Sequence, residues 1–393
     1  MSKKSFKYRL YPNKAQEQTL QETLDRCREL YNAALQERKD AYRLQRKSIS
    51  YNQQANQLPE IKEDRPEYKN IHSQVLQDTL RRVDKAMQAF FRRVKSGEKV
   101  GYPRFKGYNR FDSFTYPQAG FSLTHDNHVC LSKLGSIQVK LHRAGEGTRK
   151  TCTIKKEGDQ WYIIFSCEAT DTEPLPENHE IVGLDMGVTH FATLSDGATI
   201  DNPRHFRHSE KQLEKLQQKV ARKKKGSHRR GKARKSVAKL HRQSKNQRKD
   251  FLHKQSRKLV NTYGTLVFEK LRPANMTRRP KPKIDDATGE YLPNGASAKA
   301  GLNKSILDAG WYQFQQYCTY KAENAGRAIL FVSPNYTSQI CSGCGQIRKK
   351  ELSERWHSCD CGTELDRDHN AAINIQRLGS SQQVAISVEA PCL

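Results

Sequence analysis

The sequence predicts an α+β protein with several domains, in which two regions of short strands are each interrupted by an inserted segment. Three observations lead to this expectation. Strands resume after a pair of long helical segments, a later region alternates apolar strands with basic helices, and two closely spaced cysteine pairs stand near the end of the chain. A chain of 393 residues is long enough for two or three domains with buried cores.

The first region combines a β module with a helical insertion. Residues 6–11 alternate apolar and basic side chains, which predicts a short strand. Within 14–46, and again within 71–96, apolar residues recur at helical spacing, and the polar segment between them predicts a loop. Short alternating runs between residues 128 and 167 predict a small antiparallel sheet or barrel. The first strand is expected to join that sheet.

The second region predicts an α/β domain that carries a long basic hairpin. Residues 181–187 and 265–269 are apolar strands that each contain an acid. Between them, residues 204–258 hold 22 Lys or Arg against three acids, with apolar residues at helical intervals. This predicts two long helices that break near residues 226–231. The remaining expectations are a mobile stretch over 277–303, a helix over 305–326, a strand over 328–332 and a disordered tail over 379–393.

The charge balance indicates a polyanionic partner. The chain has 70 Lys and Arg against 42 acids, a net charge of +28, and such an excess is costly in self-repulsion unless phosphates neutralise it. The alternative is a merely soluble basic protein. The sequence contains no run of eighteen apolar residues, so it predicts no membrane span. The first residues lack the apolar core of a signal peptide. Six scattered cysteines outside the two pairs fit a reducing compartment.

The two cysteine pairs predict a structural zinc site. Cys341-x-x-Cys344 and Cys359-x-Cys361 are separated by 14 residues, and four thiolates leave no open position on the metal. Glycines at 343, 345 and 362 can supply tight turns near the sulfur atoms. The alternative is four free thiols without a metal.

Three acids stand where a metal-dependent nuclease needs them. Asp185 lies within an apolar strand, Glu269 ends another, and Asp368 precedes a helical segment. Taken singly, they could be a turn residue, a salt-bridge partner and an N-cap. Together, their order along the chain describes a split ribonuclease-H-like fold. Carboxylates at adjacent strand ends would bind two Mg²⁺ ions that promote phosphodiester hydrolysis.

Short motifs along nearly the whole chain follow the pattern of one known family. The most specific is Asp366-Arg367-Asp368-x-Asn370-Ala371-Ala372-x-Asn374-Ile375 beside the cysteine pairs. Others are the stretches 8–12, 73–77, 101–106, 183–187 and 336–339. The sequence resembles the TnpB family of RNA-guided nucleases, which bacterial transposons encode and which are similar to type V CRISPR effectors.

The resemblance implies a set of domains and an activity. The implied activity is that of a nuclease that cuts double-stranded and single-stranded target DNA beside a short adjacent motif. The nuclease would use a guide RNA taken from the transposon end. The implied catalytic residues are Asp185, Glu269 and Asp368, with Asp368 preferred over Asp366. We expect a monomer in the RNA complex, in the bacterial cytoplasm and associated with the nucleoid. The implied domains are a wedge β domain over 1–12 and 98–172, a helical recognition insert over 13–97, a RuvC-type nuclease domain over 178–335 and 364–378, and a zinc finger over 336–363.

Nucleic-acid contacts are expected on two surfaces. Tyr51, Gln74 and Gln77 are candidates for reading the adjacent motif, because glutamine can pair with adenine. They could equally cap or solvate helices. The basic helices are expected to hold phosphates of the guide–target duplex, although a charge run can also be a solvated face. The candidates there are Arg222, Lys223, Lys224, Lys225, Arg229 and Arg230.

Two other classes compete with the nuclease. One is a nuclease-inactive, RNA-guided DNA-binding repressor, which should have lost at least one of the three acids. The other is a transposase that works without RNA, whose acids usually follow the order Asp, Asp, Glu; here the order is Asp, Glu, Asp.

Overall fold

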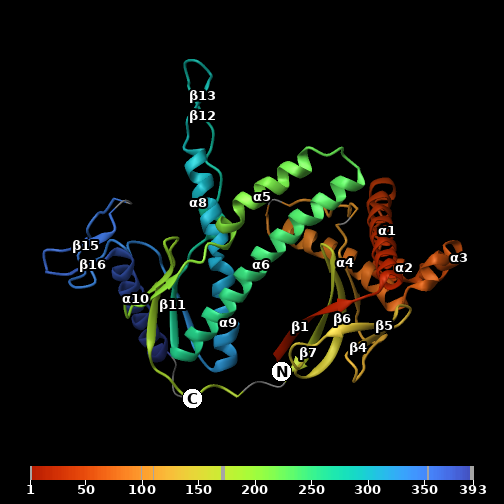
Figure 1. Cartoon of the computed structure of the whole chain (residues 1–393), viewed down its shortest axis with the longest axis horizontal. Coiled ribbons are helices and arrows are strands. Elements are labelled where there is room, and N and C mark those ends of the chain that lie inside the picture. Colours follow the sequence, from red (N-terminus) through yellow and green to blue (C-terminus); the bar gives the residue numbers. More distant parts are fainter. Residues whose placement is uncertain (1, 99, 109, 170–172, 352–353, 390–393) are drawn as a thin grey trace. The chain divides into compact units, whose positions relative to one another are not determined.

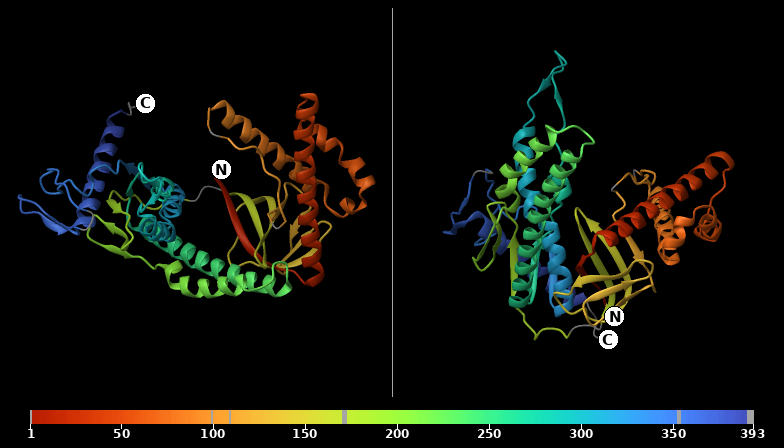
Figure 2. Two further views of the ribbon diagram at one scale, coloured as in Figure 1. Left: turned by 90° about the horizontal axis from the view of Figure 1, so that it is seen from above. Right: turned by 45° about the vertical axis from the view of Figure 1, so that its right-hand side comes forward.

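The structure is a computed structural model that describes residues 2–98, 100–108, 110–169, 173–351 and 354–389 (Figures 1 and 2). The chain divides into two compact units, residues 1–171 and 172–393. Each unit has a hydrophobic core of its own. In the part of the chain that the structure describes, no helix has the length and apolar character needed to cross a membrane.

The first unit contains a seven-stranded antiparallel sheet. Its strand order is β2-β6-β7-β1-β5-β4-β3, so the first strand of the chain lies in the middle. Phe6, Tyr8 and Leu10 alternate along β1 and are all buried, as period-2 patterning requires. The strands are β1 (Ser2–Tyr11), β2 (Ser113–Tyr116), β3 (Phe121–Leu123), β4 (His128–Leu131), β5 (Gly135–Lys140), β6 (Thr148–Glu157) and β7 (Gln160–Ala169).

The helices of this unit lie between β1 and β2 in sequence. Asn13 begins α1 with a capping box, in which its side chain accepts a hydrogen bond from the backbone N–H of Gln16 (2.9 Å). The helices are α1 (Lys14–Gln45), α2 (Tyr51–Asn56), α3 (Leu58–Asp64), the 3₁₀ helix η1 (Pro66–Asn70) and α4 (Ser73–Lys95).

The segment between the two long helices is not the predicted loop, because it folds into α2, α3 and η1. Gln54 of α2 is buried, donates a hydrogen bond to the carbonyl oxygen of Ala34 (2.9 Å) and accepts one from Arg38 (2.8 Å). A polar side chain therefore docks α2 on α1. Hydrophobic periodicity gives no sign of such a contact.

The second unit contains a five-stranded mixed sheet. The strand order is β10-β9-β8-β11-β14, in which β8, β11 and β14 are parallel and β9 and β10 are antiparallel to their neighbours. The strands are β8 (Ile181–Asp185), β9 (His190–Leu194), β10 (Thr199–Asp201), β11 (Thr265–Glu269) and β14 (Ala328–Val332). Every residue of β11 is buried, as expected for the interior of a covered sheet.

Two long helices form the predicted basic hairpin, and Figures 1 and 2 show them side by side. They are α5 (His205–Ala221) and α6 (His228–Thr262). The break lies between Ala221 and His228, where Gly226 adopts a positive φ of 87°. Gly231 was expected to contribute to the break, but it lies inside α6.

The stretch after β11 contains more regular structure than the sequence predicts. The segment expected to be mobile follows α7 (Pro273–Met276). It holds the short hairpin β12 (Lys283–Ile284) and β13 (Tyr291–Leu292) and the start of α8 (Ala296–Ala309). Figure 1 shows this hairpin beyond the end of α8. The helix expected over 305–326 is two helices, because Gly310 with φ 73° separates α8 from α9 (Trp311–Ala325).

The last helix also differs from the prediction. α10 (Arg367–Glu389) continues past Leu378, so a disordered tail beginning at residue 379 is wrong as far as Glu389; residues 390–393 lie outside the described residues. A Cβ on Gly379 would lie 2.5 Å from Val267, so the helix packs closely on β11 at this point. Before α10, β15 (Trp356–Ser358) and β16 (Glu364–Asp366) form a small hairpin.

Candidate active site and metal centre

Two of the predicted acids lie at the carboxyl ends of neighbouring parallel strands. Asp185 is the last residue of β8, and Glu269 is the last residue of β11. The register pairs Leu184 with Phe268. Asp185 and Glu269, the residues that come directly after this pair, therefore project to the same face of the sheet.

Helix α10 packs directly on the backbone of β8. Gln376 donates a side-chain hydrogen bond to the carbonyl oxygen of Ile181 (2.7 Å). A Cβ on Gly183 would lie only 2.1 Å from the carbonyl oxygen of Ala372. Position 183 therefore requires glycine, because any side chain would push the helix off the strand.

This packing brings the third acid to the other two. The helix and the strand run in opposite directions, since Gln376 meets Ile181 and Ala372 meets Gly183. Four residues advance a helix by about 6 Å and two residues advance a strand by about 6.6 Å, so the helix and the strand stay in step along their contact. The same register, continued by one more helical turn, places Asp368 beside the end of β8 that carries the first acid.

The capping of α10 distinguishes the two aspartates of the closing motif. The carboxylate of Asp366 accepts hydrogen bonds from the backbone N–H groups of Asp368 (2.8 Å) and His369 (3.2 Å), so Asp366 is the cap. The alternative interpretation of Asp368 as a plain N-cap is therefore wrong. Its carboxylate lies 3.5 Å from Arg367 Nε and 4.0 Å from Arg355 Nη1 instead.

The three carboxylates are close enough to affect one another. Burial raises the pKa of Asp185 well above its usual range, the carboxylates of Glu269 and Asp368 raise it further, and Arg367 opposes them. Burial also raises the pKa of Glu269, against a hydrogen bond that Thr337 donates to it. Such raised pKa values favour the protonated forms of Asp185 and Glu269, and a bound cation would favour their ionised forms.

Buried polar residues of α10 hold the segment that leads into the first cysteine pair. Asn370 donates to the carbonyl oxygen of Ile340 (2.7 Å) and accepts from the backbone N–H of Ser342 (2.9 Å). Asn374, one turn later, donates to the carbonyl oxygens of Thr337 (2.9 Å) and Ile340 (2.7 Å). The sequence alone predicts no role for these two residues. Their i, i+4 spacing beside the acid was the available signal.

The four cysteines converge on one point. Sγ of Cys341 lies 3.6 Å from that of Cys361, Sγ of Cys344 lies 3.6 Å from that of Cys359, and all four atoms are within 4.8 Å of one another. These separations are too long for disulfides, whose S–S bond is about 2.05 Å. They match the sulfur spacing of about 3.8 Å that tetrahedral zinc with Zn–S of about 2.3 Å requires.

Glycines make the close approach of the thiols possible. A Cβ on Gly343 would lie 2.0 Å from the hydroxyl of Thr363 and 3.1 Å from Sγ of Cys361. Gly345 and Gly362 have φ of 80° and 83°, in the left-handed region. Gly345 and Gly362 therefore act as turns, as the sequence predicts, whereas Gly343 is a point of close contact.

The thiols cannot all ionise on their own. Burial disfavours the Cys341 thiolate, but hydrogen bonds from the backbone N–H groups of Cys344 and Gly343 outweigh it and lower the pKa to about 5. The Cys344 sulfur accepts a backbone hydrogen bond that lowers its pKa, yet the neighbouring thiols Cys359 and Cys361 raise it to about 11. The Cys341 sulfur can therefore bind a cation as a thiolate, whereas the Cys344 sulfur needs a bound cation in order to lose its proton.

The cysteine and carboxylate sites differ in how closely their ligands converge. Among the residues that the structure describes, the cysteines form the one set of three or more potential metal ligands whose atoms all meet within 4.8 Å. The donor set fits one structural Zn²⁺ ion. The carboxylates of Glu269 and Asp368 raise the pKa of Asp185, and hard oxygen donors of this kind fit Mg²⁺.

Comparison with known proteins places the chain in a family. Family models match residues 164–279 ("Probable transposase", of the IS605 OrfB type), 311–375 ("Cas12f1-like, TNB domain") and 1–47 ("Helix-turn-helix domain"). The chain is 33% identical over 382 residues to an Escherichia coli (strain K12) protein named "Putative RNA-guided DNA endonuclease InsQ", covering 95% of this chain and 92% of that one. The chain belongs to the TnpB family.

Other similarities agree with this assignment. A Streptomyces pristinaespiralis protein with the same description is 33% identical over 386 residues, covering 96% of this chain and 89% of that one. The fold is shared with a chain of the "Cas12f1-sgRNA-target DNA complex", with a TM-score of 0.56, 13% identity and coverage of 95% and 98%. Residues 1–47 of this TnpB-family chain match the helix-turn-helix model; the described part of this range contains β1 (Ser2–Tyr11) and the single long helix α1 (Lys14–Gln45).

The three residues expected to read an adjacent motif in this TnpB-family protein have different surroundings. Gln74 accepts a hydrogen bond from the backbone N–H of Ala119 (3.1 Å) and so ties α4 to the sheet, which favours the structural alternative. The ring of Tyr51 packs on the core and lies 5.2 Å from the guanidinium of Arg81. Gln77, one turn before Arg81, shares its helix face and is half-buried.

The basic residues of the TnpB-family hairpin gather at its turn. Arg222, Lys224, Lys225 and Arg229 are exposed there. Arg230 instead donates a hydrogen bond to the carbonyl oxygen of Lys223 (2.8 Å) and closes the turn. Four of the six candidates are therefore displayed to solvent, while the other two shape the loop.

Proposed function

We propose that this chain is an RNA-guided DNA endonuclease of a transposable element. Its relatives are named for that activity, and its charge suits a guide RNA and a DNA target. The guide RNA would come from the transposon end, and the target would be double-stranded and single-stranded DNA beside a short adjacent motif. The protein would act as a monomer in its RNA complex, in the bacterial cytoplasm at the nucleoid.

The observation that carries this proposal is the packing of α10 on β8. It brings Asp368 to the strand ends that hold Asp185 and Glu269, in the strand order β10-β9-β8-β11-β14 of a ribonuclease-H-like (RuvC-type) domain. These three carboxylates would hold two Mg²⁺ ions. When bound, the ions would supply an activated water and a stabilised leaving oxygen for phosphodiester hydrolysis.

The residues of the chain have separate tasks in this proposal. Thr337 donates a hydrogen bond to one carboxylate oxygen of Glu269, which fixes the orientation of that side chain. Asp366 holds the start of α10, so that Asp368 is not used as a cap. The four cysteines would hold one Zn²⁺ ion and support the segment that contains Thr337. In this arrangement zinc has a structural role.

The test uses protein co-expressed with the DNA that flanks its gene. Copurifying RNA is sequenced and then used to guide cleavage of a plasmid library with randomised flanks in the presence of Mg²⁺. We expect one structured RNA and depletion of one flanking sequence, with cleavage lost in Asp185→Ala while RNA binding remains. RNA binding and target binding without cleavage by the wild-type protein would indicate a guided repressor.

A second candidate is suggested by the family description "Probable transposase" for residues 164–279. A transposase that works without RNA would copurify with no defined RNA and would join transposon ends to target DNA. The same preparation distinguishes the two, because strand joining without RNA would replace the nuclease proposal.

A further inference from the structure

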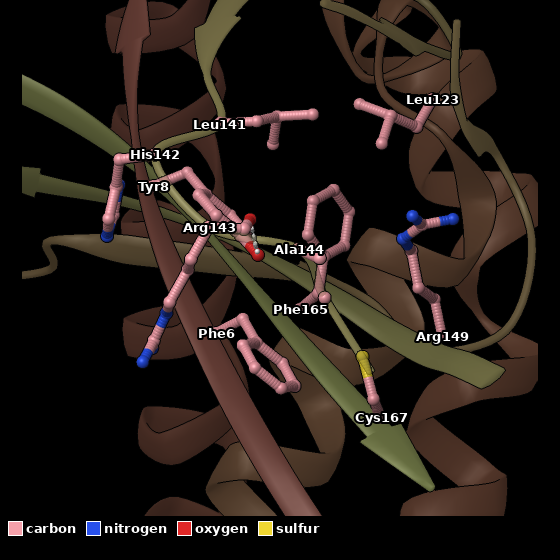
Figure 3. A pocket seen from close by; sticks show the side chains of 11 residues that line it. Phe6, Tyr8, Leu123, Leu141, His142, Arg143, Ala144, Arg149, Phe165 and Cys167 are labelled. Carbon is pink, nitrogen blue, oxygen red and sulfur yellow. Dashed lines mark hydrogen bonds between the residues drawn. The ribbon is translucent and has the colours of Figure 1, made fainter. Parts of the chain in front are cut away.

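The first unit contains a cavity of about 420 Å³ that is remote in sequence from every acid of the candidate active site. Figure 3 shows it between β1, β7 and the loop that joins β5 to β6. We call it the β1–β7 cavity. Its lining includes Phe6, Tyr8, Arg143, Arg149 and Phe165. A volume of this size is within the range of small-ligand sites.

Two guanidinium groups stand over aromatic rings in this cavity. Cζ of Arg143 lies 5.0 Å from the ring centre of Phe6, and Cζ of Arg149 lies 5.6 Å from that of Phe165. In Figure 3 the two arginines lie on opposite sides of the ring of Phe165. The rings are 6% and 1% exposed, whereas both arginines are exposed. An incoming ligand would therefore meet guanidinium groups that aromatic rings support from behind.

The loop that carries Arg143 is tied to the sheet. The hydroxyl of Tyr8 donates a hydrogen bond to the carbonyl oxygen of Arg143 (3.1 Å), and a Cβ on Gly145 would lie 3.3 Å from that hydroxyl. Phe6 and Phe165 pair directly between β1 and β7. The position of the cavity wall is therefore set by the sheet, which makes the site largely preformed.

The charge in the cavity is positive, and no carboxylate lines it. Among the described residues, no acid lies within ion-pair distance of Arg143 or Arg149. The neighbouring Glu146 pairs with Lys4 (2.9 Å), and the charge of Arg143 helps to lower the pKa of Glu146 without a direct ion pair. Arginines without a direct ion pair are suited to an anionic ligand. Their planar groups can also stack on a base.

We propose that the β1–β7 cavity binds one unstacked nucleotide of the guide RNA. The base stacks on a guanidinium plane, and the adjoining phosphate pairs with the second guanidinium. This inference rests on the proposed function only in requiring that the protein holds a guide RNA. Single-stranded target DNA has the same chemistry, and the test separates the two.

The test measures the affinity of purified protein for its guide RNA as a function of salt. Arg143→Gln and Arg149→Gln combined should weaken binding about tenfold or more and reduce the slope of log K against log[salt] by about 0.7, the value for one lost phosphate contact on a single strand. Arg143→Lys with Arg149→Lys should keep the slope but still weaken binding, because lysine cannot stack. Lys140→Gln, an exposed residue of the same sheet outside the cavity, is the matched control and should change neither quantity substantially.

Photo-crosslinking locates the nucleotide. Guide RNA that carries 4-thiouridine should crosslink at one position to a peptide from residues 141–149, and the double glutamine variant should lose that crosslink. If the wild-type protein retains guide RNA and cleaves, yet the glutamine variants bind RNA with unchanged affinity and slope, the cavity proposal is overturned and the nuclease proposal stands. If the variants lose only affinity for single-stranded DNA, the assignment to RNA is wrong.

Discussion

The cysteine cluster and the carboxylate cluster reach their geometry by opposite routes. The four cysteines come from a segment of 21 residues, from Cys341 to Cys361, and their sulfur atoms converge through local glycine turns. The three acids are spread from Asp185 to Asp368 and meet only because two strands and a helix pack in one register. A local site tolerates change in the rest of the fold, whereas a distributed site depends on contacts far from its ligands.

The largest expected effect separates the two aspartates of the closing motif. Asp368→Asn should lower the cleavage rate by about 1,000-fold or more, because it removes a charge that would bind metal. Asp366→Asn is the matched control and should stay within a few-fold of wild type, because asparagine caps a helix as well as aspartate does. Guided plasmid cleavage measures both variants, and equal losses would contradict the division of roles.

The next effect concerns the local site. Cys344→Ser should remove bound zinc and cost roughly 3–5 kcal/mol of stability in the region around residues 341–363. Elemental analysis and hydrogen exchange of that region provide the measurements. Cys130→Ser, on β4 of the first unit, should leave the zinc content unchanged. Full zinc occupancy in Cys344→Ser would exclude the four-thiolate site.

Gly183→Ala tests whether the acid spacing depends on a contact that involves no acid. The added Cβ would overlap the backbone of α10, so we expect a loss of about 2–3 kcal/mol and a large fall in cleavage. Gly301→Ala in α8 is the control. Its Cβ would meet nothing within 4 Å, and alanine should stabilise that helix by up to about 1 kcal/mol. Thermal melting and cleavage assays that show a normal Gly183→Ala protein would remove the packing argument.

The burial of Asp185, together with the carboxylates beside it, predicts a pH dependence of stability. The raised pKa of Asp185 means that the folded protein binds this proton more tightly than the unfolded chain does. Without Mg²⁺, stability should therefore fall as pH rises from about 4 through the raised pKa. Asp185→Asn should escape that loss, so its melting temperature should increasingly exceed that of wild type between pH 4 and pH 7 in Mg²⁺-free buffer. Parallel curves would show that Asp185 carries no such penalty.

The smallest effect concerns the basic hairpin. Replacing Lys223, Lys224 and Lys225 with glutamine should reduce the slope of log K for RNA binding against log[salt] by up to about 2–3, with little change in the melting temperature. Lys223 is half-buried at the turn and should contribute least of the three. A slope equal to that of wild type would move the RNA to another surface.

The sequence predicts the local site more completely than the distributed one. Spacing alone identified the four cysteines. Asp185 and Glu269 were recognisable as acids in apolar strands, but the choice of Asp368 over Asp366 depended on family resemblance. The structure supplies a physical reason, the capping of α10. The missed elements include α2 and the helix beyond Leu378, which contacts without a long apolar stripe hold in place. Gln54 docks α2 on α1, and Gly379 lets α10 approach the side chain of Val267.

The contact of Gly183 with α10 also bears on how such nucleases lose activity during evolution. Most single base changes at the first or second position of a glycine codon introduce a side chain, and at position 183 its Cβ would overlap the helix backbone. A copy of this gene could therefore become a guided binder while Asp185, Glu269 and Asp368 all remain in its sequence. A survey for inactive copies that inspects only the three acids would count such a protein as active. Such a survey should therefore also inspect position 183.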